Sequence, residues 1–171
     1  MLERPSARLR GDVAIAFAKS SGLCASAAYL HPRVVEPDCL ASVALALRRA
    51  AYAPHETIPA ASLTLVERGR AIRRGRLLAV GGGMGAEMIV SRRALRDTAG
   101  AVALSHVQVL SIPRDALLQI VTAHGCYPRA ASALRHCAVK MALHRAVLRI
   151  ARRIREQRRQ EGPRQGGGGG G

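Results

Sequence analysis

The chain has 171 residues, 49% of them apolar, and carries a formal net charge of +16 at pH 7. This length supports one core with appended segments and excludes two full domains. No apolar run reaches the roughly 18 to 20 residues of a bilayer span, and the start lacks the apolar part of a secretory signal, so we expect a cytoplasmic protein.

The basic charge alone is weak evidence for a polyanion ligand. Arginine, alanine, glycine and proline are in excess along the whole chain, and aromatic residues make up only 2% of it. Interleaved aromatic side chains, the usual stacking platform for single strands, are therefore missing. We expect no specific nucleic-acid partner, and a polyanion-binding protein stays a further alternative.

Three short helices are expected before residue 50. Apolar spacing predicts an amphipathic helix over residues 6–19. A second helix over 23–30 should close before Pro32, because the residue before a proline is pushed out of the helical region. Asp38 is expected to be the N-cap of a third helix that ends at residue 49.

Residues 50–112 are expected to form β-structure, because short strand-like runs alternate with single glycines. The expected strands cover residues 63–67, 70–73, 76–80 and 102–112. Gly69 and Gly75 lie where a tight turn would need positive φ, which glycine adopts without steric cost. The pattern predicts successive antiparallel hairpins, interrupted by a turn of helix or a loop over the polar residues 91–97.

Two helices should follow the strands. Pro113 suits the first turn of one that Gly125 ends, and Pro128 opens the longest helix, which runs to about Gln160. In this last helix ten basic residues outweigh one glutamate, which gives +9. We expect its first half to dock on the β-structure and its second half to project as a cationic amphipath, with calmodulin, acidic lipid or an acidic neighbouring subunit as alternative partners.

The docking side of the last helix is expected to carry Leu134, Cys137 and Met141. The four cysteines should be reduced and mostly buried, because their spacing matches no zinc motif and the chain lacks a secretion signal. No nucleophile, base and orienting group stand at productive spacing, so we assign no catalytic residue, no metal and no enzymatic activity.

The glycine-rich segment 80–86 has two interpretations. Its G-x-G-x-x-A pattern after an apolar run is found in dinucleotide-binding βαβ units. Such a unit needs a long helix after the turn and an acidic residue about twenty positions further on. Asp97 comes too early and Asp115 too late, so we favour the second interpretation, which uses the order of all the elements.

That order resembles the cyclic-nucleotide-binding domain family over residues 38–154. The best-matching segments are residues 66–69, 81–89, 103–105 and 109–115. The resemblance implies an α+β fold, namely an antiparallel, jelly-roll-like β-roll of two sheets flanked by N-terminal helices and a long C-terminal helix. It also implies three parts, namely linker-like helices over residues 1–37, the domain over 38–160 and a disordered glycine-rich tail over 161–171.

Residues 5–13 are similar to the helix that links the pore to this domain in voltage-gated and cyclic-nucleotide-gated cation channels. Together with residues 85–89 and 95–97, the segment looks like the cytosolic end of a potassium-channel-like protein of algae or protists. The resemblance implies a regulatory module at the cytosolic face of a membrane. Its partners would be a channel transmembrane domain or neighbouring subunits.

The resemblance also implies a cyclic-nucleotide pocket, with cyclic AMP or cyclic GMP as ligand. Its residues would be Gly83, Gly85, Ala86, Glu87, Arg96, Thr98 and Ala99. Three positions depart from the family: Ala86 replaces the glutamate that holds the ribose, Glu87 comes one place late, and Asp97 stands where an arginine pairs with the phosphate. We therefore expect a degenerate pocket that requires no cofactor, with a functional nucleotide-binding protein as the alternative.

Overall fold

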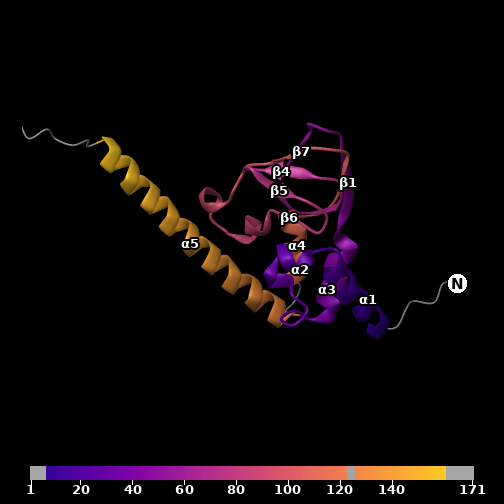
Figure 1. The fold of residues 1–171 in the computed structure, drawn as a ribbon. Coiled ribbons are helices and arrows are strands. Elements are labelled where there is room, and N and C mark those ends of the chain that lie inside the picture. Colours follow the sequence, from indigo (N-terminus) through magenta and orange to yellow (C-terminus); the bar gives the residue numbers. More distant parts are fainter. Residues whose placement is uncertain (1–6, 123–125, 161–171) are drawn as a thin grey trace, which may run out of the picture.

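The structure, a computed structural model, describes residues 7–122 and 126–160 (Figure 1). The predicted glycine-rich tail over 161–171 and the helix end at Gly125 lie outside these residues. With short 3₁₀ helices labelled η, the elements of the first half are α1 (Ala7–Ser20), α2 (Leu23–Ser26), η1 (Ala28–Leu30), α3 (Pro37–Ala46), β1 (Arg48–Tyr52), β2 (Thr57–Ile58), β3 (Ser62–Arg68), β4 (Ala71–Arg73) and β5 (Arg76–Leu78). Those of the second half are β6 (Gly83–Met84), η2 (Ala86–Ile89), η3 (Arg93–Leu95), β7 (Ala101–Ala103), β8 (Val107–Pro113), α4 (Arg114–Thr122) and α5 (Pro128–Gln160). None of the described helices combines the length and apolarity that crossing a bilayer requires.

The strands form two four-stranded antiparallel sheets. The strand orders are β1-β8-β3-β6 in one sheet and β2-β7-β4-β5 in the other. The N-terminal helices lie at one end of the sheets, and α5 runs diagonally past them (Figure 1). This arrangement confirms the predicted α+β fold class, whereas the division into three parts stays a prediction.

The predicted hairpin turn is confirmed at Gly75 and wrong at Gly69. β4 and β5 pair through a turn whose central residues, Arg74 and Gly75, have φ of 50° and 76°, as a type I′ turn requires. Gly69 also has positive φ, at 88°, but it joins β3 to β4, which belong to different sheets. The predicted strand over 102–112 likewise divides into β7 and β8, one in each sheet.

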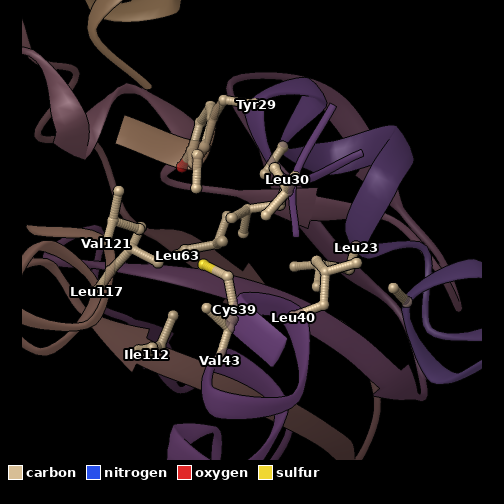
Figure 2. Packing of buried hydrophobic residues seen from close by; sticks show 14 of the residues in the cluster. Leu23, Tyr29, Leu30, Cys39, Leu40, Val43, Leu63, Ile112, Leu117 and Val121 are labelled. Carbon is tan, nitrogen blue, oxygen red and sulfur yellow. The ribbon is translucent and has the colours of Figure 1, made fainter. Parts of the chain in front are cut away.

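Two apolar cores lie on opposite faces of the β1-β8-β3-β6 sheet. Successive side chains of a strand alternate between the faces. Leu65 and its cross-strand neighbour Leu110 belong to the core beneath the helices. Figure 2 shows Leu63 and Ile112, another cross-strand pair of this core. Val66 and Val109 point instead into the space between the two sheets. The first core takes in residues of α1 to α5, so the helices and this sheet are packed as one body.

Four predictions about helices near residues 23–49 and 113 need correction. Residues 23–30 form α2 and η1 rather than one helix, although they end before Pro32 as expected. The third helix begins at Pro37, whose missing N–H suits the first helical position, so Asp38 is not its N-cap. It ends at Ala46 because the following residues pair with β8 as β1. Pro113 ends β8, and α4 begins one residue later.

The long helix begins and ends where the sequence predicts, over Pro128–Gln160. Leu134 is buried, and Cys137 and Met141 pack against the helix-side core, which confirms the predicted docking side. The predicted burial of cysteines holds for Cys39 but is wrong for Cys126, which is exposed. Within the described residues, no group of three or more possible metal-ligating side chains is found.

Glu36 caps the N-terminus of α5. Its two carboxylate oxygens accept hydrogen bonds from the backbone N–H groups of Arg129, at 2.8 Å, and Ala130, at 3.1 Å. Partial burial alone would raise the pKa of Glu36. The backbone hydrogen bonds, and then the positive charge of Arg129, outweigh this effect, so the pKa of Glu36 is lowered. One side chain before α3 thus fixes the start of the longest helix.

Replacing Glu36 by alanine should lower the free energy of unfolding at pH 7 by about 1 kcal/mol, as loss of a helix cap does. Because the folded-state pKa is lowered, this contribution is present above the unfolded-state pKa and is lost as the pH falls through the folded-state value. Urea unfolding of wild type and variant between pH 7 and about pH 3 measures the difference. Replacement of the exposed Glu156 is the control, and a gap that stays constant with pH would contradict the capping role.

Candidate functional site

The glycine-rich segment turns sharply at Gly85 before the short helix η2. Gly85 has φ of 85°, and a Cβ atom there would overlap the carbonyl oxygen of Ser62 on β3. η2 covers only Ala86–Ile89, and each strand of the two sheets pairs in antiparallel fashion. A dinucleotide-binding unit needs a long helix at this point on a parallel sheet. The dinucleotide interpretation is therefore wrong, and the turn serves to bring η2 close to β3.

Beneath η2, a buried guanidinium group lies between two carboxylates. Arg73 Nη2, at the end of β4, lies 2.7 Å from Glu87 Oε1 and 3.3 Å from Asp97 Oδ2. The three side chains are 13%, 9% and 16% exposed, so each ion pair is largely removed from water. Two opposite charges in such a place attract each other strongly, and removal of one leaves the other as an uncompensated buried charge. We call Arg73, Glu87 and Asp97 the ionic triad.

Two further arginines contact the ionic triad from the outside. Arg74 Nη2 lies 2.9 Å from Asp97 Oδ1, and Arg145 Nη2 of α5 lies 3.7 Å from Glu87 Oε1. Arg73 also donates through Nε to the carbonyl oxygen of Ala99, at 2.9 Å. Three guanidinium groups thus face two carboxylates, and the buried group, that of Arg73, donates through Nε and Nη2 to protein oxygens.

A small hollow of about 210 Å³ lies beside the triad. Its lining residues are Arg73, Arg74, Arg76, Leu78, Gly83 and Asp97. Gly83 leaves no space for a larger residue, because a Cβ atom there would overlap the side chain of Ser26. The hollow is therefore shaped by the backbone at Gly83, by the ion-paired Arg73, Arg74 and Asp97, and by the exposed Arg76.

Arginines also hold the carbonyl groups that follow η2. Arg96 donates to the carbonyl oxygens of Val90, at 2.7 Å, and Ser91, at 3.0 Å. Burial, and then the positive charges of Arg114 and Arg93, lower the pKa of Arg96. Its guanidinium is thus directed at backbone carbonyl groups at the end of the glycine-rich segment rather than at the ionic triad.

The structure brings together only part of the predicted site. Gly83 lines the hollow, and Glu87 faces Arg73, whereas Thr98 is exposed. The Ala86 carbonyl oxygen accepts a hydrogen bond from the Tyr29 hydroxyl at 3.3 Å. Burial and then the charge of Glu87 raise the pKa of that phenol.

Three arginines that contact the site, Arg73, Arg74 and Arg145, were missed from the sequence. Arg73 and Arg145 carry a pattern that could have revealed them. Arg73 is two positions after the buried Ala71, so strand alternation puts them on one face of β4. Arg145 is four positions after Met141 and therefore continues the docking side of α5.

The fold and the site together define an α+β β-roll domain with an internally ion-paired hollow. No family model and no curated protein matches the sequence. Among solved structures, the chain is similar to the N-terminal domain of a transcriptional regulator from Streptomyces coelicolor A3(2). The identity is 17%, the match covers 82% of this chain and 96% of that chain, and the TM-score is 0.48. A likeness of this extent assigns no function.

Proposed function

We propose that this chain is a regulatory module of the cyclic-nucleotide-binding type whose own side chains have replaced the ligand, so that it is insensitive to cyclic AMP and cyclic GMP. The ionic triad is the observation that carries the proposal. The α+β fold agrees with what the sequence resemblance implies, and two members of the triad, Glu87 and Asp97, are positions at which the resemblance implies a pocket. The module would act through its packing rather than through a bound nucleotide.

Competition for Arg73 is the first reason for insensitivity. A cyclic phosphate needs a cation, and Arg73 is already 2.7 Å from Glu87 Oε1 and 3.3 Å from Asp97 Oδ2. To bind the phosphate through this guanidinium, the protein would have to break a buried ion pair and leave Glu87 with only the more distant Arg145. Such a loss costs several kcal/mol, which a single new ion pair does not recover.

Charge and missing contacts are the second reason. Glu87 and Asp97 would repel a phosphate in the hollow, and Arg96 is held by the carbonyl groups of Val90 and Ser91. The resemblance also implies that the ribose acceptor is lost at Ala86. Two missing charge-assisted hydrogen bonds, each worth about 1.5 to 3 kcal/mol, lower the affinity by roughly two to four powers of ten.

The proposed regulatory target is a cation channel to which the module is joined through its N-terminal helices. Sequence similarity over residues 5–13 supports this part of the proposal. The packing of α1 and α3 into the same core as β3 and β8 offers a route by which the roll would influence those helices. The coding sequence upstream of Met1 tests the idea, since a set of apolar spans is expected there and a different soluble domain would contradict it.

Calorimetric titration of the purified chain with cyclic AMP and cyclic GMP tests the insensitivity. We expect no saturable heat for wild type up to about 1 mM ligand. Glu87→Gln should introduce weak saturable binding, because it removes one repelling charge and frees part of Arg73. Saturation in the micromolar range by wild type would contradict the proposal.

The matched control for this titration is Glu67→Gln. Glu67 pairs with Arg49 at 2.9 Å, and the two side chains are 29% and 78% exposed, so the same charge is removed from an ion pair outside the triad. This control should stay silent with both nucleotides. If Glu67→Gln and Glu87→Gln gained equal binding, the change would reflect net charge, and the triad would not be the cause of insensitivity.

A further inference from the structure

The outer face of α5 carries a row of large apolar side chains that nothing in the described structure covers. Val139, Leu143, Val147, Ile150 and Ile154 have between 44% and 69% of their surface exposed. Their spacings of four, four, three and four residues keep them within an arc of roughly 80° at 3.6 residues per turn. We call these five residues the α5 seam.

The α5 seam is distinct from the side by which the helix docks on the body. Leu134 and Met141 pack in the helix-side core, and Arg145 donates to the carbonyl oxygen of Leu95 at 2.9 Å. These docked residues lie on the opposite side of the helix from the seam. The C-terminal half of α5 also extends away from the sheets (Figure 1). The seam is therefore open along its length.

Its spacing fits a helical partner. Leu143, Val147, Ile150 and Ile154 alternate by four, three and four residues, as the a and d positions of a coiled coil do. An arc this narrow is typical of such a seam, whereas a helix that lies on a membrane presents a wider apolar face, often with Trp or Phe. α5 has no aromatic residue, and the basic residues of its C-terminal half lie outside the seam.

The positive charge of α5 indicates which kind of partner helix would bind the seam. Between Lys140 and Arg159 the helix has eight basic residues and one glutamate, which gives +7. A second copy of this chain would bring the same charge, and like charges beside a coiled-coil seam are destabilising. Arg153 lies beside one edge of the seam, and Lys140 and Arg158 lie beside the other. Acidic residues that flank a partner's apolar row would meet positive charge on both edges.

We propose that the α5 seam docks an acidic amphipathic helix of another protein, with apolar residues at its a and d positions and glutamate or aspartate at the flanking e and g positions. Apolar burial along the seam supplies the affinity, and the flanking charges set the choice of partner. This inference goes beyond the proposed function, and it holds whether or not the roll binds a nucleotide.

The test uses the full chain and a fluorescein-labelled synthetic coiled-coil peptide of about four heptads, with Leu and Ile at a and d and Glu at e and g. Fluorescence anisotropy should show saturable binding, and the same peptide with Lys at e and g should not bind. Leu143→Ala with Ile150→Ala should weaken binding by at least about tenfold, because alanine keeps the helix but removes the apolar contacts. No binding of the Glu peptide, or equal binding of the Lys peptide, would overturn the proposal.

Adjacent charge reversals separate the seam from general attraction to a basic helix. Arg153→Glu beside the seam should weaken binding of the Glu peptide several-fold more than Arg152→Glu, which makes the same charge change on the far side of the helix. Equal effects would overturn the proposal. So would sedimentation showing a dimer that the Leu143→Ala and Ile150→Ala changes dissociate, or seam-dependent binding to phosphatidylserine vesicles without binding of the Glu peptide.

Discussion

Arg73→Ala should lower the free energy of unfolding by about 3 kcal/mol or more. The substitution leaves Glu87 and Asp97 without the guanidinium that lies between them, and both carboxylates are at least four-fifths buried. Glu87 then keeps only Arg145, at 3.7 Å, and Asp97 only the exposed Arg74, at 2.9 Å. A buried charge that loses its buried partner costs more than the ion pair itself contributes. Urea unfolding followed by circular dichroism measures the change, since the helices give a strong signal throughout the transition.

The neighbouring arginine provides the control for this prediction. Arg74 also contacts Asp97, at 2.9 Å, but its side chain is 62% exposed. Exposed ion pairs contribute little, so Arg74→Ala should cost less than about 1 kcal/mol. If Arg73→Ala were as mild as Arg74→Ala, the carboxylates beneath η2 would not depend on Arg73, and the ionic triad would have no structural role.

Gly85→Ala should destabilise the protein about as much as Arg73→Ala does, because it lowers the free energy of unfolding by at least about 3 kcal/mol. Alanine at φ of 85° is strained, and its Cβ atom would overlap the Ser62 carbonyl oxygen, which belongs to β3 and cannot move without disturbing the sheet. The variant should also expose Glu87, because Gly85 sets the position of η2. Thermal and urea unfolding measure the first effect.

Gly75→Ala is the control that separates backbone strain at positive φ from the steric overlap of the added Cβ atom. It has a similar φ of 76°, but a Cβ atom there has open space around it. Gly75→Ala should therefore cost only about 1 kcal/mol, which reflects the backbone conformation alone. An equal loss for Gly75→Ala and Gly85→Ala would contradict the close approach of Gly85 to β3.

Local patterns in the sequence predicted the elements better than their pairing. Pro128 marked the start of α5, and the spacing of Leu134, Cys137 and Met141 predicted its docked side. Gly69 illustrates the limit, because a glycine indicates positive φ but does not determine which strands pair. The residues after Ala46 fitted a helix by spacing, and only their pairing with β8 makes them a strand.

Only some residues of the ion-paired hollow could be predicted from the sequence. The glycine-rich segment and the departures at Ala86 and Asp97 pointed to a pocket without its usual ligand contacts. They did not indicate the ion pair between Arg73 and Glu87, because these residues lie fourteen positions apart and meet only when β4 is placed beneath η2. Partners of this kind depend on tertiary structure, so strand alternation could suggest that Arg73 points inward but could not name its acceptor.

A double-mutant cycle between Arg73 and Glu87 tests the self-filled pocket most directly. The free energies of unfolding of wild type, Arg73→Met, Glu87→Gln and the double variant together give the coupling energy of the two side chains. We predict a coupling of at least about 1.5 kcal/mol, with the double variant more stable than Arg73→Met alone, because it no longer buries the Glu87 charge. A coupling close to zero would show that the two groups do not interact in solution and would contradict the proposal that the protein fills its own ligand position.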